Sequence, residues 1–222
     1  VGLNTGNVVA FSMKLPETKY PNPPREAYPR WPEATNFYDA LLDQLQSVPG
    51  VASAALGMNH PLSSGWTSQI EVVGQPASEG PKDEVRIRAV TPSYFETLGI
   101  PLQRGRMLWR DDRGDTPFVI VVNEALARRY FSNADPVGKQ LVLWGQPRTI
   151  VGVVKGERFG GPQADIEPAL YPPLQQMPMS DVTLVVRANQ NPAAVISAVR
   201  STMQTLDADI ALFDVETLDE TL

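Results

Sequence analysis

The middle of the chain, Thr91–Gly156, reads TPSYFETLGIPLQRGRMLWRDDRGDTPFVIVVNEALARRYFSNADPVGKQLVLWGQPRTIVGVVKG. This stretch alternates apolar segments of strand length, one capped helix and tight glycine turns. Its charged residues stand at turns and helix ends, and no group of His, Cys, Asp and Glu gathers along it. The pattern indicates a structural centre rather than an active site, and the rest of the chain is organised around it.

The central helix of this stretch has a clear start signal. Asn123 follows the apolar run Val119–Val122, and an asparagine at this place can accept a hydrogen bond from a free N–H of the first turn. Glu124 stands at the positive end of the helix dipole, and Arg128 stands near the negative end. We therefore predict a buried strand followed by a helix, with a hairpin around Gly145 farther on.

The segment before the centre predicts a sheet with one dry face and one wet face. In Glu84–Val90, apolar residues alternate with Arg86 and Arg88. Because successive side chains of a strand point to opposite faces, we expect both arginines to face solvent. The segment Pro101–Arg106 is expected to lead through a glycine turn.

Each end of the chain predicts a β-α-β unit. At the N-terminal end, strands at Asn7–Leu15 and Val51–Met58 flank a helix that Thr35 can cap. A loop with six prolines connects the first strand to this helix, and we expect its aromatic side chains to pack on the domain.

At the C-terminal end, strands at Val182–Arg187 and Ile210–Val215 flank a helix that begins with Asn191 and Pro192. Two such halves would join as one sheet with both helices on one face. The fold class is therefore α+β, with the middle of the chain as an insertion.

Composition excludes several classes of protein. The chain has 222 residues, 42% of them hydrophobic, with 19 Lys and Arg against 25 Asp and Glu, which gives a net charge of −6. That charge disfavours nucleic acid as a partner. There is no cysteine, so disulfides and thiolate metal sites are excluded. No apolar run reaches the ~20 residues of a membrane helix, and the start at Val1 suggests a longer parent protein.

The motifs that could carry chemistry have ordinary explanations. Gly138–Lys139 lacks the earlier glycine and the following Ser or Thr of a phosphate-binding loop. His60 is the single histidine and has no elbow motif around the nearby serines, so we expect neither a metal site nor a catalytic base there. Adjacent carboxylates indicate solvated turns, and they occur at Asp83–Glu84, Asp111–Asp112 and Asp219–Glu220. The sequence thus predicts no catalytic, cofactor-binding or metal-binding residue.

A basic cluster lies in the first half of the central stretch. Its members are Arg104, Arg106, Arg110 and Arg113, interleaved with Met107 and Trp109. Arginine mixed with aromatic residues suits an interface. We prefer the interpretation that this segment is a turn, in which the charges of the arginines are balanced by Asp111, Asp112 and Asp115.

The segments together resemble the extracytoplasmic core domain of MacB-like ABC transporter permeases, a group that includes FtsX-like and lipoprotein-releasing permeases. Phrases in matching order carry the resemblance: SVPGVASAALGMNHPLSSG (47–65), TPSYFETLGIPLQRGR (91–106), VVNEALARRYF (121–131), DPVGKQL (135–141), IVGVVKG (150–156) and ALYPPLQQ (169–176). The chain departs from the family pattern at Met107–Leu108, which displaces the aromatic residue to Trp109, and at Lys155–Gly156.

The resemblance implies a porter-like layer built from residues 1–59 and 178–222, with an inserted, mixed α/β, Sabre-like lobe at residues 60–177. In such permeases the domain lies outside the cytoplasmic membrane between the first two of four transmembrane helices. A cytoplasmic ABC ATPase supplies energy, so ATP is expected there and no cofactor is expected in this domain. The implied partners are the transmembrane helices, the ATPase, a second permease copy and a periplasmic protein.

The function implied by the resemblance is a noncatalytic domain that transmits ATP-driven movement to a substrate or partner protein, in transport, efflux or lipoprotein release. Movement would enter near Val1 and Leu222. The candidate contact residues lie in two loops of the inserted lobe and are Ser63, Ser64, Trp66, Arg104, Arg106, Trp109 and Arg110. The alternative function is an extracytoplasmic module that binds a ligand or peptide between the two lobes, because crevices between domains are common ligand sites.

Overall fold

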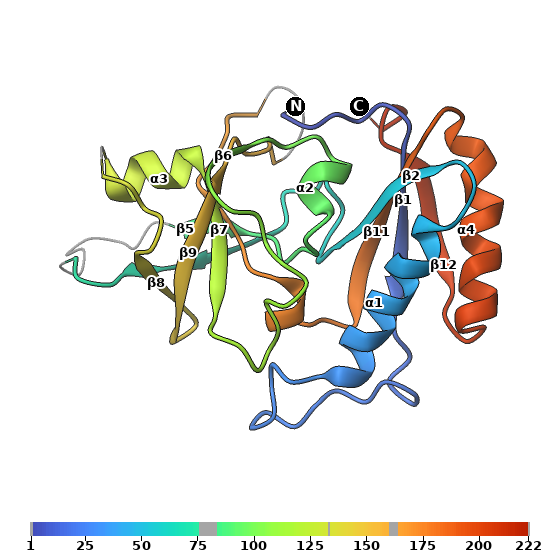
Figure 1. The fold of residues 1–222 in the computed structure, drawn as a ribbon, viewed down its shortest axis with the longest axis horizontal. Helices are drawn as coiled ribbons and strands as arrows, with labels where there is room; N and C mark the ends of the chain where they lie inside the picture. Colours follow the sequence, from blue (N-terminus) through green and yellow to red (C-terminus); the bar gives the residue numbers. More distant parts are fainter. Residues whose placement is uncertain (1, 76–83, 133, 160–163, 222) are drawn as a thin grey trace.

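The computed structural model describes residues 2–75, 84–132, 134–159 and 164–221. Two β-sheets stand side by side, one flanked by long helices and one by short ones (Figure 1). Three residues considered above, Val1, Asp83 and Leu222, lie outside the described ranges. Within those ranges, no helix is long and apolar enough to cross a membrane.

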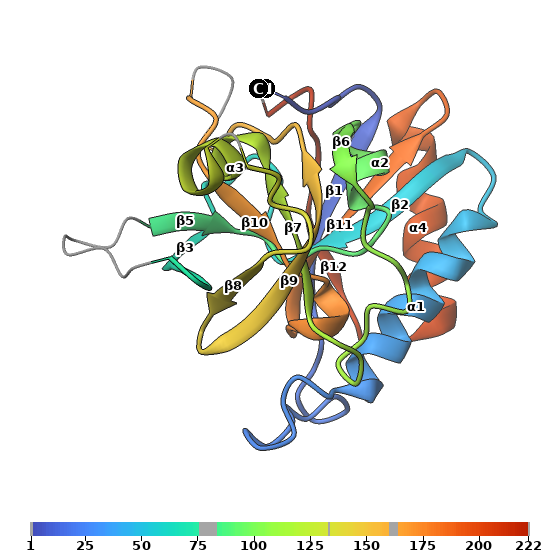
Figure 2. The same ribbon diagram turned by 60° about the vertical axis from the view of Figure 1, so that its left-hand side comes forward.

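The first sheet joins the two ends of the chain. Its strand order is β12-β1-β11-β2, with every neighbouring pair antiparallel. The two long helices lie on the same face of this sheet in both views (Figures 1 and 2). We call this unit the porter layer, and its elements are β1 (Val8–Lys14), α1 (Pro32–Gln46), β2 (Val51–Gly57), β11 (Asp181–Ala188), α4 (Pro192–Leu206) and β12 (Leu212–Thr217). The predicted α+β class, with two interlocked β-α-β halves, is confirmed.

Strand β1 is buried on both faces. Val9 and Phe11 pack into the cluster that lies beneath α1 and α4, and neither side chain is exposed. Val8 and Ala10 point to the opposite face, as alternation along a strand requires, and they pack into a second cluster. A layer of helices covers one side of this sheet, and the middle of the chain covers the other.

The second sheet belongs to the middle of the chain. Its order is β3-β5-β10-β7-β9-β8-β4, and β6 pairs with β9 outside this path. Pairs β7–β9 and β5–β10 are parallel, so the sheet is mixed. We call this unit the inserted lobe, and its elements are β3 (Trp66–Gln69), β4 (Glu71–Val72), β5 (Glu84–Ile87), α2 (Tyr94–Thr97), β6 (Leu102–Gly105), β7 (Val119–Asn123), α3 (Glu124–Phe131), β8 (Gln140–Leu143), β9 (Gln146–Val154), β10 (Ala169–Tyr171) and the 3-10 helix η1 (Leu174–Gln176).

The inserted sheet curls until its two edges meet. Strands β3 and β4 stand at opposite ends of the strand order, yet only Ile70 separates them in sequence. Near this closure, the Trp144 indole donates a hydrogen bond to Ser68 Oγ at 3.0 Å. The two ends of the sheet are therefore joined by the chain itself.

Strand β6 occupies most of the segment Pro101–Arg106, where we predicted only a glycine turn. Gly105 has a φ of +72°, and a Cβ atom on it would lie 2.2 Å from the carbonyl oxygen of Val151 on β9. A Cβ atom on Gly152 would lie 2.1 Å from the carbonyl oxygen of Arg106. The two glycines allow β6 and β9 to approach, so they serve strand pairing and not only the turn.

The helix starts agree with two of three predicted caps. Asn123 Oδ1 accepts from the Leu126 amide at 2.9 Å, and the Asn191 side chain accepts from the Ala193 amide, so both predicted caps are confirmed. The predicted Thr35 cap is wrong, because α1 begins at Pro32. Proline suits the first turn of a helix since its missing N–H would have no partner there.

The two units share one buried interface. The second cluster combines Val8 and Ala10 of the porter layer with Tyr94, Phe95 and Tyr171 of the inserted lobe. All five residues are 0% exposed. The porter strands fall within residues 8–57 and 181–217 and the inserted strands within 66–171. The finer division at 59/60 and 177/178 stays a prediction.

Candidate functional site

Several polar side chains form hydrogen bonds and ion pairs where the inserted lobe meets the porter layer. We call this contact the seam. It includes residues 59–63 beside Arg88, the loop at residues 106–116, and the glutamines of η1.

Arg88 lies in the inserted lobe beside the seam, and its burial contradicts the sequence prediction. We predicted a wet face, but the residue is 0% exposed, whereas Arg86 on the same face is half-buried. Its guanidinium donates to Glu157 Oε2 at 2.6 Å and to Asn59 Oδ1 at 2.7 Å. It also donates to three backbone carbonyl oxygens, those of His60, Pro61 and Ser63. Alternation along β5 gave the correct face but not its depth, because the loop at 59–63 covers that end of the strand.

The Arg88–Glu157 pair is electrostatically coupled. Burial raises the pKa of the Glu157 carboxyl, and the Arg88 guanidinium opposes that rise. For Arg88 itself, burial lowers the pKa, but Glu157 together with Tyr94 and Tyr171 opposes this effect, and the net direction is upward. Each charge is therefore held by the other, and removal of one would leave the second buried and unpaired.

His60 joins the same loop to the porter layer. Its Nδ1 accepts from the Leu62 amide at 3.2 Å, and its Nε2 lies 3.0 Å from Glu216 Oε1 on β12. Burial lowers the pKa of His60, Glu216 opposes this shift, and Arg88 adds to it. These contacts give His60 a role in loop placement.

The loop at residues 106–116 carries most of the basic cluster. Arg106 makes a two-pronged contact with Asp112, at 2.9 and 3.0 Å, and its guanidinium lies 3.8 Å from the Trp109 ring centroid. The prediction that neighbouring aspartates balance the arginines is therefore correct for Asp112. It is wrong for Arg110 and Arg113, whose carboxylate partners lie on helix α1.

An arginine clamp crosses the seam at this point. Arg110 donates to both carboxylate oxygens of Asp43, at 2.8 and 2.7 Å, and Arg113 pairs with Asp39. Hydrogen bonds from Arg110 lower the pKa of Asp43. We use the term arginine clamp for these four residues. The partners are more than sixty positions apart in sequence, so nothing local could have revealed the pairing.

Two buried glutamines of η1 support the clamp and were missed by the sequence analysis. Gln175 Nε2 donates to Asp39 Oδ1 at 2.6 Å. Gln176 accepts from the Val119 amide and donates to the carbonyl oxygens of Arg113 and Pro117. Their only sequence signal was the phrase ALYPPLQQ, which carries no information about burial.

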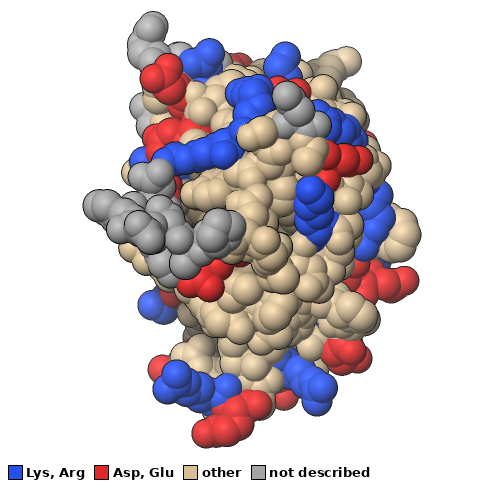
Figure 3. Space-filling model, turned by 90° about the vertical axis from the view of Figure 1, so that its left-hand side faces the viewer, with Lys and Arg blue, Asp and Glu red and all other residues tan. Residues whose placement is uncertain are grey.

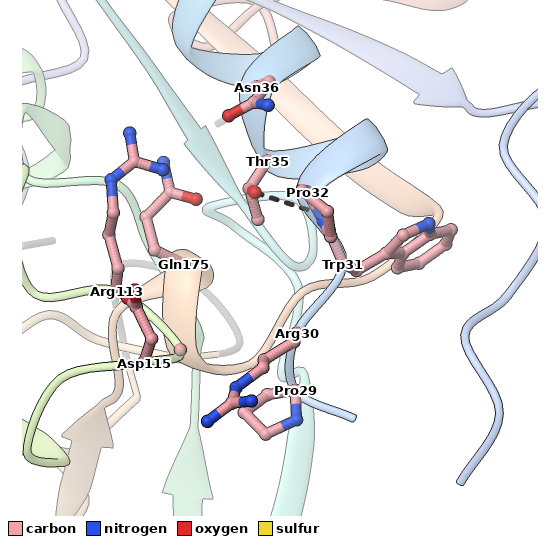
Figure 4. Close-up of a pocket in the computed structure, with 10 residues that line it drawn as sticks. Pro29, Arg30, Trp31, Pro32, Thr35, Asn36, Arg113, Asp115 and Gln175 are labelled. Atoms are coloured by element: carbon pink, nitrogen blue, oxygen red, sulfur yellow. Dashed lines mark hydrogen bonds between the residues drawn. The ribbon is translucent and has the colours of Figure 1, made fainter. Parts of the chain in front are cut away.

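A pocket of about 260 Å³ opens in the seam beside the clamp (Figure 4). One wall comes from the proline-rich loop and the first turn of α1, and the other from the 113–115 segment and η1. The lining residues are Pro29, Arg30, Trp31, Pro32, Thr35, Asn36, Arg113, Gly114, Asp115 and Gln175. This is a cavity between the two lobes, as the alternative function requires.

The candidate contact residues have varied surroundings. Trp66 and Trp109 are 51% and 58% exposed, and Arg104 lies at the surface 4.0 Å from Asp135. The carbonyl oxygens of Ser63 and Ser64 accept hydrogen bonds from Arg88 and Arg86.

Arg106, Trp109 and Arg110 lie together on one loop, where Arg110 is bound to α1. Trp66 instead lines an apolar groove with Tyr28 and Trp144. Their role as partner contacts stays a prediction.

The described residues show neither a surface of one charge on the face drawn in Figure 3 nor a cluster of metal-binding side chains. On the face of the inserted lobe that points away from the porter layer, basic and acidic side chains are interspersed (Figure 3). Among the described residues, no group of three or more His, Asp and Glu is placed to hold a metal ion.

Comparison with known proteins agrees with this architecture. The sequence model of the MacB-like periplasmic core domain matches residues 5–202. The chain belongs to the MacB-like periplasmic core domain family. It is an extracytoplasmic domain of an ABC transporter permease, as the resemblance predicted.

Individual relatives cover only part of the chain. The macrolide export ATP-binding/permease protein MacB of Aggregatibacter actinomycetemcomitans is 34% identical over 68 residues, which are 31% of this chain and 11% of that protein. The uncharacterized ABC transporter permease YvrN of Bacillus subtilis is 29% identical over 99 residues, 42% of this chain and 24% of that protein. The matches therefore span a quarter or less of these relatives.

Solved structures show the same fold at low identity. The periplasmic region of MacB from Actinobacillus actinomycetemcomitans superposes with a TM-score of 0.61 at 17% identity, covering 99% of this chain and 94% of that chain. The extracellular domain of the noncanonic ABC-type transporter YknZ from Gram-positive bacteria gives a TM-score of 0.54 at 14% identity, covering 93% of this chain and 100% of that chain. The porter layer with its inserted lobe is thus shared by these domains.

Proposed function

We propose that this domain is noncatalytic and transmits movement from the membrane part of an ABC permease to a substrate or partner protein. The observation that carries the proposal is the double burial of the porter sheet. Val8 and Ala10 pack against the inserted lobe while Val9 and Phe11 pack beneath the helices. A displacement of β1 would therefore move both units together, because close-packed interiors transmit strain.

The position of the chain ends supports this direction of transmission. Both ends of the described chain lie side by side at one end of the molecule (Figures 1 and 2). They lead into β1 and out of β12, which are neighbours in the porter sheet. Transmembrane helices attached there would act on adjacent strands. The further partners in this proposal are a cytoplasmic ABC ATPase that binds ATP, a second permease copy and a periplasmic protein, with no cofactor in the domain itself.

A flexible linker tests the proposal. In the full permease, a Gly-Ser insertion between each chain end and its membrane helix should strongly reduce transport, since flexible linkers do not carry force. Cytoplasmic ATP hydrolysis and the thermal stability of the domain should persist. As a matched control, the same insertion in the turn at Gly74 lies away from both ends and should leave transport in place. Full transport with linkers at both ends would contradict mechanical transmission.

A second candidate function is ligand binding between the two lobes, and the seam pocket favours it. The pocket has walls from both units, so a bound ligand would bridge them. Ligand retention measured by native mass spectrometry, together with a rise in unfolding temperature, would support this function. The absence of any retained ligand would leave transmission as the sole proposal.

A further inference from the structure

The seam pocket contains a buried acceptor without a donor. Gln175 is 3% exposed, and its Oε1 has no hydrogen-bond partner among the described residues. In Figure 4 the oxygen points across the pocket toward Thr35 on α1. A buried polar atom of this kind is unfavourable until a donor reaches it.

The orientation of this amide is fixed by the arginine clamp. Gln175 donates through Nε2 to Asp39, which also pairs with Arg113. A carboxylate can only accept, so nitrogen must face Asp39 and oxygen must face the pocket. The pocket therefore offers an acceptor that is already placed, and a ligand must supply the N–H donor.

The walls and charges of the pocket favour an apolar, neutral group. Pro29 and Pro32 form part of the lining, and neither carries a backbone N–H. Arg113 is neutralised by Asp39. Arg30 and Asp115 carry opposite charges and lie on separate sides of the opening (Figure 4). These features leave no preference for a charged ligand.

We propose that the seam pocket binds a short apolar peptide segment, which donates a backbone N–H to Gln175 Oε1 and packs one side chain against Pro29 and Pro32. A volume of about 260 Å³ suits one residue with its flanking amide groups rather than a larger molecule. This inference rests on the second candidate function and specifies its site and ligand class.

Binding at this place would strengthen the contact between the two units. Gln175 belongs to the inserted lobe and Thr35 belongs to the porter layer, so the ligand would occupy the space between them. A ligand that binds only the folded, closed seam stabilises that arrangement by mass action. Ligand occupancy would thus be coupled to the arginine clamp through Asp39.

The experiment uses the 222-residue chain and N-acetyl-leucyl-leucinamide as the probe, with binding followed by calorimetry or by amide shifts in NMR. We expect saturable binding. The same peptide with N-methylated backbone amides lacks the donors and should bind on the order of tenfold more weakly, as expected for one lost hydrogen bond. The variant Gln175→Met should weaken the unmodified peptide by a similar factor.

A steric pair of variants locates the site without touching the core. Asn36 is exposed on the rim of the pocket. Asn36→Trp should fill the opening and abolish binding, whereas Asn36→Ala should retain it, and both should unfold at the wild-type temperature. Peptide binding that survives Asn36→Trp and Gln175→Met would overturn this site but keep ligand binding as a function. Absence of saturable binding up to about 10 mM peptide would overturn the site and its ligand class, whereas a different ligand retained on the wild-type chain would still support ligand binding.

Discussion

Two ionic contacts near the seam lie in opposite surroundings, one within the inserted lobe and one between the two units. The Arg88–Glu157 pair is fully buried, with both side chains 0% exposed, whereas Arg110 and Asp43 in the arginine clamp are 56% and 49% exposed. A buried pair is costly to break because the remaining charge has no water. An exposed pair is screened by solvent and salt. The buried pair therefore fixes the inserted lobe beside the seam, whereas the exposed Arg110–Asp43 pair joins the two units and can open at low cost.

The largest expected effect comes from the buried pair. Arg88→Met leaves the Glu157 carboxylate buried without its partner and should lower the free energy of unfolding by about 3–5 kcal/mol. Urea denaturation of the isolated chain measures the change.

Arg86→Met is the matched control for Arg88→Met, because Arg86 lies two residues away on the same strand face and pairs with the partly exposed Glu167. We expect a loss of about 1 kcal/mol or less for it. Equal losses for the two arginines would show that burial is not what distinguishes them.

Acid should restore part of the stability that Arg88→Met removes. Burial raises the pKa of Glu157, and the loss of Arg88 removes the group that opposes that rise. The folded variant then binds a proton more readily than the unfolded chain, so its stability increases as pH falls through the folded pKa. The difference in unfolding free energy between variant and wild type should shrink between neutral pH and pH ~5. A difference that does not change with pH would exclude Glu157 as the stranded charge.

The exposed Arg110–Asp43 pair of the clamp should have a smaller, salt-dependent effect. Asp43→Asn removes one exposed carboxylate and should cost about 0.2–1 kcal/mol at low salt. Hydrogen bonds from Arg110 lower the pKa of Asp43, so this contribution is present above the unfolded pKa and is lost as pH falls through the folded one. Denaturation in ~1 M NaCl should nearly remove the difference from wild type. Arg88→Met should keep most of its defect in the same salt.

The smallest stability effect is expected at the exposed aromatic residues. Trp66→Ala and Trp109→Ala remove side chains that are more than half exposed, so the unfolding free energy should change by about 0.5 kcal/mol or less. If these residues contact a partner, transport by the full permease should fall nonetheless. Unchanged transport in both variants would remove them from the candidate contact surface.

Local sequence patterns predicted the elements and the layer that they form. Asn123 and Asn191 were found because a cap acts on its own first turn, and the β-α-β halves were found because strand and helix periods are local. Arg88 was placed wrongly because alternation assigns a face and says nothing about the loop that covers it. Arg110 could not be paired with Asp43 from sequence, since their proximity depends on how the two units meet.

The phrases shared with the family predicted the overall architecture but not the individual side-chain contacts. The phrases predicted a porter layer with an inserted lobe, and the solved structures of the same fold confirm that class. They gave no indication of Gln175, whose importance comes from one hydrogen bond to Asp39 and one oxygen without a partner in the described part of the chain. The domain boundaries and the contact residues stay predictions because they concern partners and divisions that an isolated chain does not define.

The closure of the inserted sheet at Ile70 has a consequence for strand alignment. Strand β3 pairs with β5 at one end of the sheet and β4 pairs with β8 at the other. Since one residue joins β3 to β4, a slip of β3 along β5 would pull β4 along β8 by a comparable distance. A slip by one residue would also turn the buried Ile70 and Val72 outward. The register of the β3–β5 pair and that of the β4–β8 pair are therefore coupled, and neither can shift alone.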